Sequence, residues 1–345
     1  MAYSTISKPG LHFNTKLYSG TGSSQNITGV GFQPDWTWVK SRTNAEAHVL
    51  RDAVRGNYRL NTASSGAQDD ATSSISGFVS DGFTVATADA VNNSSQTYVA
   101  WNWKANGAGS ANTDGDINST VSVNTTAGFS IVKWTGNGTA GATVGHGLGS
   151  EMKFMILKDY GLSRTWITYH HSLGNQSGIN LNENGAGGTN NNAYWNSTSP
   201  TSSVFSTGTY SNENNSNYIC YCFAEKKGYS KFGSYTGNAS TNGPFIYTGF
   251  KPAWVLQKNY TNGSSNDWTL ADNKRPGYNE INKRIVPNDS AAEATNNQID
   301  FVSNGFKIRG SESNANGNNN TYIYMAFAEN PLVVNVGQSI PATAG

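Results

Sequence analysis

The sequence predicts an all-β protein made of three tandem jelly-roll-like β-sandwich repeats of the concanavalin-like type. Three observations lead to this prediction. The chain has 38 glycines, many Asn, Ser and Thr residues, and few leucines, which favours short strands and tight turns over helix bundles. One set of motifs occurs three times along its 345 residues. Turn signals also separate short apolar runs about every 8–12 residues, as in β-sandwiches.

Each repeat contains the same three motifs in the same order. The first reads "LYSGTG", "KWTGNG" and "SYTGNA" in the successive repeats. The second is a Gly-led strand, "GVGFQPDWTWVKSR", "GHGLGSEMKFMILKD" and "YTGFKPAWVLQKN", which aligns Lys40, Lys158 and Lys258. The third is a Tyr-led strand, "YVAWNWKA", "YICYCFAE" and "YIYMAFAE". Because internal periodicity decides the fold, each repeat of about 100 residues is predicted to form one sandwich.

These motifs set the expected domain boundaries. We expect repeat 1 at 1–105, a Gly/Ser/Asn-rich linker at 106–126, repeat 2 at 127–226, repeat 3 at 227–330 and an extended C-terminal tail at 331–345. Only "KKGYSK" joins repeats 2 and 3, which predicts a fairly rigid pair. Asp-Gly or Asn-Gly hairpin signals precede Phe83 and Phe306. Repeat 2 reads "SSVFST" around Phe205, so its turn needs different chemistry.

The paired tryptophans of the first Gly-led strand, Trp36 and Trp38, could form a sugar-binding platform or a core. The aligned residues are Phe154 and Ile156 in repeat 2, and Trp254 and Leu256 in repeat 3. A core tolerates such exchanges among large apolar residues, whereas a stacking platform needs a flat ring each time. We therefore expect both tryptophans to fill a sandwich interior, with Lys40 at its rim.

Charge and hydropathy exclude several classes of partner. The net charge of +1 supplies no basic field for nucleic acid or an anionic membrane. The chain has no run of 18 apolar residues, and "MAYSTISKPG" lacks the regions of a signal peptide. We expect a soluble protein that is not secreted by the signal-peptide route and does not insert into a membrane. Cys220 and Cys222 lie on one face of a strand and are expected to be buried free thiols.

A resemblance covers nearly the whole chain. "FNTKLYSGTG", "DAVRG", "SDGFTV", "YVAWNWKANG", "NTTAGFSIVKWTGNGTAGATVGHGLG", "YSKFGSYTGNAS", "PFIYTGFKPAWVLQK" and "TYIYMAFAENP" carry it. Together they resemble the jelly-roll domain that recurs in virion structural proteins of marine tailed bacteriophages, often described as tail-fibre-like. The resemblance implies a virion component, made in the host cytoplasm without a signal peptide, with β-sandwich repeats and no assigned catalytic residues. It leaves the position in the virion open.

The carboxylates show no repeated catalytic pattern. Glycoside hydrolysis normally needs two carboxylates about 5–10 Å apart. Asp52, Asp69 and Asp70 in repeat 1, and Glu280 and Asp300 in repeat 3, are candidates, but the three repeats do not place a carboxylate at a common position. We therefore expect a protein that is not an enzyme and uses no cofactor.

Three further features could bind a metal ion or another ligand, but we expect each to have a structural role. Adjacent His170 and His171 should point to opposite faces of a strand, one buried and one solvated. "TDGDIN", with Asp114 and Asp116, resembles part of a calcium loop but lacks its closing glutamate, so a polar turn is favoured and no metal is expected. Asp52–Arg55 and Asp272–Arg275 are expected to be structural charge pairs.

If the sandwiches bind glycans, variable loops are the place to look. We select Tyr194, Trp195, Asn191 and Asn192 in the tip "NENGAGGTNNNAYWNSTS", and secondarily the tip "GSESNANGNNN". Both loop tips can also be plain solvated turns.

The leading hypothesis is a non-enzymatic phage virion protein, surface-exposed and tail-fibre-like or decorative, with a role in host attachment. A capsid decoration protein without a receptor role, and a carbohydrate-binding or glycan-cleaving protein, are the alternatives. Expected partners are other virion proteins and a host surface glycan, with the chain as a trimer or a pseudo-trimeric monomer.

Overall fold

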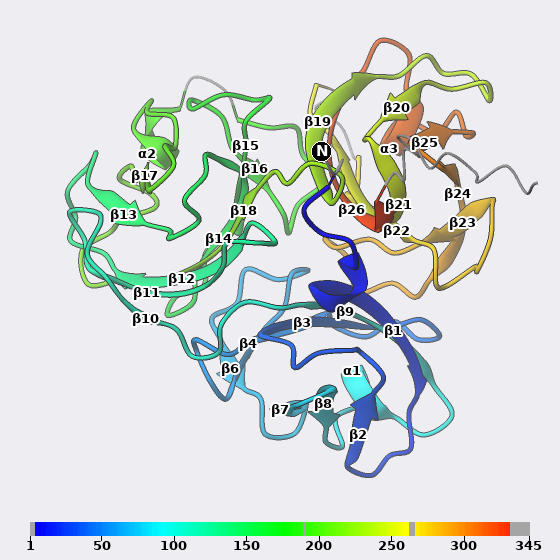
Figure 1. Cartoon of the computed structure of the whole chain (residues 1–345), viewed down its shortest axis with the longest axis horizontal. Coiled ribbons are helices and arrows are strands. Elements are labelled where there is room, and N and C mark those ends of the chain that lie inside the picture. Colours follow the sequence, from blue (N-terminus) through cyan, green and yellow to red (C-terminus); the bar gives the residue numbers. More distant parts are fainter. Residues whose placement is uncertain (1–3, 189–190, 262–265, 332–345) are drawn as a thin grey trace, which may run out of the picture.

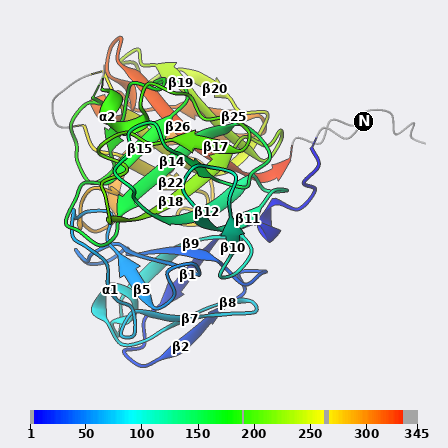
Figure 2. The ribbon, with the colours of Figure 1, turned by 90° about the vertical axis from the view of Figure 1, so that its left-hand side faces the viewer.

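The computed structural model describes residues 4–188, 191–261 and 266–331, and antiparallel β-sheets dominate it. Three lobes surround a common centre (Figure 1). We call them the first unit (β1 to β9), the second unit (β10 to β18) and the third unit (β19 to β26). In the side view of Figure 2, the first unit lies below the other two. The predicted all-β class is confirmed.

The first unit has a six-stranded sheet and a three-stranded sheet. The larger sheet has the order β1 (Phe13–Ser19), β9 (Thr97–Trp103), β3 (Trp36–Ser41), β4 (Val49–Asp52), β5 (Tyr58–Leu60) and β6 (Asp69–Asp70). The smaller sheet has the order β2 (Gln25–Thr28), β8 (Gly82–Val85) and β7 (Ile75–Val79). The 3₁₀ helix η1 (Pro9–Leu11) precedes β1, and the short helix α1 (Asp89–Asn92) precedes β9.

The second unit contains a seven-stranded sheet with the order β10 (Ser110–Asn112), β11 (Ser119–Asn124), β12 (Phe129–Thr135), β18 (Asn217–Ala224), β14 (Met152–Asp159), β15 (Ile167–His170) and β16 (Ile179–Asn180). Strands β13 (Thr143–Gly145) and β17 (Val204–Ser206) form its small sheet, and α2 spans Asn192–Trp195. Residues 106–126 are therefore not a plain linker, because β10 and β11 extend the larger sheet. The alternation of Val121 and Val123 with polar residues in β11 is the strand pattern that explains this.

The third unit has two four-stranded sheets. One has the order β19 (Ser230–Thr236), β26 (Thr321–Pro331), β21 (Phe250–Asn259) and β22 (Thr269–Asp272). The other has the order β20 (Phe245–Tyr247), β25 (Gly305–Ile308), β24 (Ala294–Val302) and β23 (Ile281–Arg284), and α3 spans Ser313–Asn316. The predicted C-terminal tail lies outside the described residues, apart from Pro331 at its start.

The same strand order occurs in all three larger sheets. The segments β1-β9-β3-β4, β12-β18-β14-β15 and β19-β26-β21-β22 correspond strand by strand. The repeated sequence motifs occupy corresponding strands in each unit.

Gly82 and Gly305 of the repeated hairpin signals must be glycines, because the backbone of the neighbouring strand lies too close for a side chain. A Cβ atom would lie 1.9 Å from the Ile27 carbonyl oxygen at Gly82, and 2.1 Å from that of Ile246 at Gly305. In the second unit Val204 takes this position and pairs with a glycine, Gly145, on the neighbouring strand. In the second unit the glycine therefore lies on the opposite strand of the pair.

The inner strands of each larger sheet are buried on both faces. One face packs inside its own unit, and the other meets the remaining units in a single apolar cluster, the central core. Its aromatic members are Phe13, Trp36, Trp38, Trp101, Trp103, Phe129, Phe154, Trp166, Tyr221, Phe223, Tyr229, Phe232, Trp254, Trp268 and Phe327. Trp36 stacks on Tyr221 of the second unit with ring centroids 4.2 Å apart, and Trp103 meets Trp254 of the third unit at 5.7 Å.

The burial of Trp36 and Trp38 is confirmed, but their predicted location is wrong. Both have no exposed surface and lie in the central core, whereas Val39 packs inside the first unit. Alternate residues of a strand face opposite sides, so the two tryptophans share the side that faces the other units. The aligned Phe154, Ile156, Trp254 and Leu256 lie in the same cluster.

A buried asparagine holds the turn that follows β1, β12 and β19, the first strands of the shared strand order. Asn92, Asn212 and Asn316 stand six residues before the Tyr of the Tyr-led strand and are all fully buried. Their Oδ1 atoms accept hydrogen bonds from the backbone N–H of Thr21 (2.9 Å), Asn137 (3.0 Å) and Asn238 (2.8 Å). This contact explains the repeated "SGTG", "TGNG" and "TGNA" motifs.

We predict that Asn316→Ala lowers the free energy of unfolding by about 2–3 kcal/mol, because it leaves buried backbone groups without partners. The Asn316 amide also donates to the carbonyls of Gly310 and Ser240, both at 2.8 Å. Exposed Asn318 provides a matched control, and Asn318→Ala should change stability by less than about 0.5 kcal/mol. Chemical denaturation measures both variants, and equal losses would contradict the assigned role.

Candidate functional site

Buried polar contacts cross the boundaries between the units. The last residues of β4, β15 and β22 are Asp52, His170 and Asp272, and each contacts a neighbouring unit. Tyr221 of the second unit donates its hydroxyl to Asp52 at 2.9 Å. Trp101 of the first unit donates its ring N–H to Asp272 at 3.0 Å. His170 Nε2 lies 3.1 Å from the Tyr324 carbonyl of the third unit. One equivalent position therefore links the three units in a cycle.

The two aspartates also form buried ion pairs with arginine. The Asp52–Arg55 and Asp272–Arg275 contacts both measure 2.7 Å, and the four side chains are at most 1% exposed. Burial opposes the charge of Arg55, yet the Asp52 carboxylate raises the pKa of this guanidinium above its usual value. Burial, followed by the Asp52 charge, raises the pKa of Tyr221. Both pairs are buried and hydrogen-bonded, as expected for structural charge pairs.

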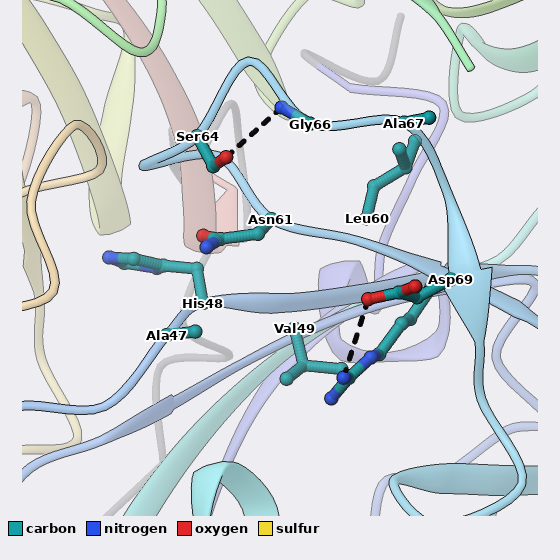
Figure 3. Close-up of a pocket in the computed structure, with 10 residues that line it drawn as sticks. Ala47, His48, Val49, Leu60, Asn61, Ser64, Gly66, Ala67 and Asp69 are labelled. Atoms are coloured by element: carbon teal, nitrogen blue, oxygen red, sulfur yellow. Dashed lines mark hydrogen bonds and ion pairs between the residues drawn. The ribbon is translucent and has the colours of Figure 1, made fainter. Parts of the chain in front are cut away.

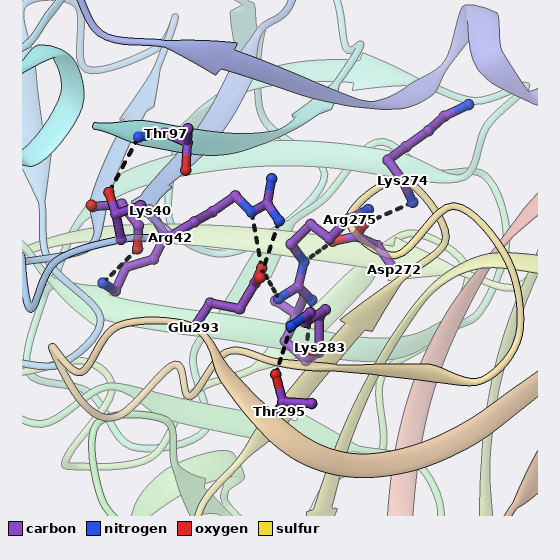
Figure 4. A network of polar contacts seen from close by, with 12 residues as sticks. Lys40, Arg42, Thr97, Asp272, Lys274, Arg275, Lys283, Glu293 and Thr295 are labelled. Carbon is purple, nitrogen blue, oxygen red and sulfur yellow. Dashed lines mark hydrogen bonds and ion pairs between the residues drawn. The ribbon is translucent and has the colours of Figure 1, made fainter. Parts of the chain in front are cut away.

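Arg275 belongs to a wider network between the first and third units (Figure 4). Its Nη1 lies 3.2 Å from Glu293, which also binds Arg42 of the first unit through two contacts of 3.0 Å. The backbone N–H of Glu293 donates to the Arg42 carbonyl at 3.0 Å. The Glu293 carboxylate thus binds one arginine from each unit, which fixes the orientation of the first and third units.

Three aligned lysines are buried close to these boundaries. Lys40, Lys158 and Lys258 have no exposed surface, so the predicted rim position of Lys40 is wrong. Each ammonium group donates to backbone carbonyls, in the case of Lys40 to Ser41 at 2.9 Å. Lys258 reaches across to the Asn184 carbonyl of the second unit at 3.0 Å. Burial lowers the pKa of each lysine to about 8.

The histidine pair differs from its prediction. The rings of His170 and His171 stack with centroids 5.1 Å apart, because His171 lies beyond the end of β15 and does not follow strand alternation. His171 is half-buried, and its Nε2 lies 3.1 Å from the Phe232 carbonyl of the third unit. Both histidines therefore contact the backbone of the neighbouring unit.

Four of the five candidate carboxylates are engaged by other residues of the described chain. Asp69 lines a cavity of about 160 Å³ in the first unit and lies 3.6 Å from Arg59 (Figure 3). Asp70 accepts from the backbone N–H of Thr72 at 2.7 Å. Asp300 pairs with Arg309 at 3.2 Å. The buried carboxylate of Asp52 is already engaged by Arg55 and Tyr221, and Glu280 lies exposed in the turn before β23.

The residues selected for glycan binding are divided between surface and core. Trp195 is 1% exposed, donates to the Ser177 carbonyl at 2.8 Å and packs against Tyr169. Asn191 caps α2 by accepting from Ala193 at 2.9 Å. Tyr194 is half-buried against Tyr210, and Asn192 is exposed. The Trp195 ring therefore lies in the core and is not available to a glycan. Of the four selected residues, Asn192 and part of Tyr194 are the most accessible.

The calcium-like turn and the cysteines take structural roles. Asp116 accepts from the backbone N–H and hydroxyl of Thr143, which lowers the pKa of its carboxyl. Asp114 accepts from Asn112 at 2.8 Å. Cys220 and Cys222 are buried free thiols, as predicted, with their sulfur atoms 3.3 Å apart. Among the described residues, no group of three or more His, Cys, Asp and Glu side chains could hold a metal ion.

Comparison with known protein families gives one match. A family model described as a domain of unknown function (DUF7483) matches residues 8–331. The chain belongs to the DUF7483 family. No curated protein and no solved structure matches it. In the described part of this DUF7483 chain, no helix has the length and apolar character needed to span a membrane.

Sequence reasoning missed the contacts that link the units of this DUF7483 protein. It identified Asp52 and Asp272 with their arginines but assigned no partners from other units. The alignment of "YVAWNWKA", "YICYCFAE" and "YIYMAFAE" places Trp101, Tyr221 and Met325 at one position. Trp101 and Tyr221 each have a hydrogen-bond donor, and they donate to Asp272 and Asp52. Met325 has no donor, and at its boundary His170 contacts the Tyr324 carbonyl instead of a side chain.

We predict that Tyr221→Phe lowers the free energy of unfolding by about 1.5–3 kcal/mol, because a buried carboxylate loses a hydrogen bond. Tyr229 provides a matched control, since it is also buried and its hydroxyl makes no hydrogen bond to another residue of the described chain. Tyr229→Phe should cost much less in the same denaturation experiment. Equal costs would show that the Asp52 contact contributes nothing specific.

We also predict acid-sensitive stability from the buried histidines. Burial lowers the pKa of His170 and of His48 to about 3, with the neighbouring His171 and Lys40 respectively adding to the effect. The folded protein keeps both rings neutral, while the unfolded chain binds protons below about pH 6.5. Stability from these histidines is therefore present above about pH 6.5 and is lost as the pH falls toward 3.

His170→Gln tests this origin, because glutamine can still donate to the Tyr324 carbonyl but does not titrate. In this range the free energy of unfolding of the variant should depend less steeply on pH, by at most about 1.4 kcal/mol per pH unit. Denaturant titrations at a series of pH values measure the slope. An unchanged slope would exclude His170 as a source of acid sensitivity.

Proposed function

We propose that this chain is a non-enzymatic structural protein of a bacteriophage virion, exposed on the particle surface with a tail-fibre-like or decorative role in host attachment. The motif resemblance supports the virion assignment. The single observation that carries the structural role is the central core, which joins three units of matching strand order into one body. A single chain with this arrangement is a pseudo-trimer and fits places where other virion proteins present three-fold symmetry.

We further propose that each unit is a jelly-roll-like, concanavalin-like β-sandwich. Each unit has a larger and a smaller antiparallel sheet, with a unit-specific apolar cluster in addition to the central core. Such sandwiches present loops at their ends for recognition, while the sheets supply rigidity.

A capsid decoration role without receptor binding is the second candidate. The three-lobed form favours it, because one chain covers a local three-fold position on a capsid without having to trimerise. A carbohydrate-binding or glycan-cleaving protein remains the alternative from another class.

Electron microscopy of intact particles tests the proposed location. Antibody fragments against the chain should bind at the outer surface, on a tail appendage for the attachment role or on the head for the decoration role. A position wholly inside the capsid would contradict surface exposure. Incubation with host polysaccharide tests the non-enzymatic assignment, for which no oligosaccharide should be released. Release that depends on the purified chain would overturn it.

A further inference from the structure

Two large aromatic side chains lie next to each other on the outer face of the third unit. Phe245 and Tyr247 stand two positions apart on β20 and are 48% and 54% exposed. Ile246 between them is buried in the apolar cluster of the third unit. Because alternate residues of a strand share a face, both rings lie on the side of the small sheet that points away from this cluster. Strand β20 lies at the outside of the third lobe (Figure 1).

This pair differs from the other exposed apolar side chains of the molecule. Within the described ranges, the large hydrophobic residues that are exposed are Leu11, Tyr58, Leu162, Phe245, Tyr247 and Tyr278. Phe245 and Tyr247 are the two of these that share a strand. Single exposed hydrophobic residues are normal on a protein surface, whereas adjacent ones form a patch that indicates a binding surface.

The equivalent positions of the other units carry no aromatic residue. Tyr247 pairs with Gly305, and Thr28 of the first unit pairs with the matching Gly82, which sets the alignment of the small sheets. The residues at the two positions are Asn26 and Thr28 in the first unit and Thr143 and Gly145 in the second. The fold therefore forms without aromatic rings at these positions.

Gly305 leaves room for the Phe245 ring on this face. A Cβ atom at Gly305 would lie 3.0 Å from Cε2 of Phe245, so the ring lies over the backbone of β25. A ring that lies along a sheet has one side against the backbone and the other side toward solvent. This is the orientation in which an aromatic ring stacks on a flat ligand.

Charged side chains lie beside the aromatic pair on the same face. Phe245 pairs with Lys307 of β25, and Lys307 pairs with Asp300 of β24. Residues directly opposite each other have Cβ atoms about 4.5–5.5 Å apart. Lys307 donates to the Gly243 carbonyl at 2.7 Å, and Asp300 binds Arg309 at 3.2 Å. An ammonium group has three donors and a carboxylate has several acceptor positions, so both can also bind hydroxyl groups of a ligand.

This combination of groups fits a neutral saccharide. A sugar ring has a flat C–H face that can stack on an aromatic ring, and hydroxyl groups around its edge that both donate and accept. An anionic ligand or an anionic membrane surface would meet the Asp300 carboxylate, while Lys307 and Arg309 already bind oxygen atoms of the chain. Strand β20 has three residues, which is short for stable pairing with a strand of a second copy.

We propose that Phe245 and Tyr247 form a stacking surface for a neutral oligosaccharide chain, with Lys307 and Asp300 binding its hydroxyl groups. Cα atoms two positions apart on a strand are about 6.4–6.8 Å apart, so the two rings can contact adjacent sugar units. The surface is open and contacts one side of the ligand, which favours a chain of several units over a single sugar. The inference goes beyond the proposed virion role and concerns the chain itself, wherever it lies in the particle.

Ligand-observed NMR on the full chain tests the proposal, with cellohexaose, laminarihexaose and mannohexaose as neutral probes and hexagalacturonate as the anionic comparison. Phe245→Asn and Tyr247→Thr copy the residues of the first unit at these positions. Each should weaken binding about fivefold, which corresponds to about 1 kcal/mol of lost stacking, and the double variant should abolish it. Phe245→Tyr keeps the ring and should bind like the unchanged chain. Tyr58→Ala removes a 44% exposed ring of the first unit and should leave binding unchanged.

Thermal unfolding and light scattering accompany each variant. If Phe245→Asn fails to fold, Tyr247→Thr decides the test. Absence of binding by all three neutral probes would overturn the proposal, as would binding of hexagalacturonate alone. Sugar binding that survives in the double variant would place the site elsewhere and also overturn it. A dimer that the double variant converts to a monomer, with no sugar bound by either, would assign the surface to a second copy of the chain instead.

Discussion

The larger sheet of each unit has two apolar faces, and its own unit covers only one of them. Across the three units, the second faces carry Trp36 and Trp38, Phe154 and Ile156, and Trp254 and Leu256, and they cover one another in the central core. Burial of large aromatic surfaces is among the strongest stabilising contributions available to a protein of this composition. Left alone, each unit would expose a broad apolar sheet face to water. The association of the three units is therefore a condition of their folding.

Polar contacts at the boundaries add specificity to this apolar association. Apolar packing alone would tolerate several arrangements of three similar units. Tyr221 meets Asp52, Trp101 meets Asp272, and His170 meets the Tyr324 backbone, so each boundary has its own donor and acceptor. A mismatched arrangement would leave a buried carboxylate without its partner, which is costly. The different donor and acceptor at each boundary therefore specify which unit lies next to which around the central core.

The sequence predicted the strand-rich fold, the repeated motifs and the burial of Trp36 and Trp38, because these depend on local pattern and on comparison within the chain. It misplaced the two tryptophans because a strand with two apolar faces does not reveal which face belongs to its own unit. Lys40 was misplaced because a buried ammonium group satisfied by backbone carbonyls has no sequence signature. The stacked histidines follow from where β15 ends, which is the least predictable property of a strand. Trp195 shows that an aromatic in an Asn-rich loop can belong to the core.

The central claim is that the three units fold as one body around a shared core, and differential scanning calorimetry of the full chain tests it most directly. The account predicts a single transition whose calorimetric and van't Hoff enthalpies agree, with a ratio of about 1. Two or three resolved transitions, or a calorimetric enthalpy that is a multiple of the van't Hoff value, would show that the units unfold independently. That result would contradict the dependence of each unit on the central core.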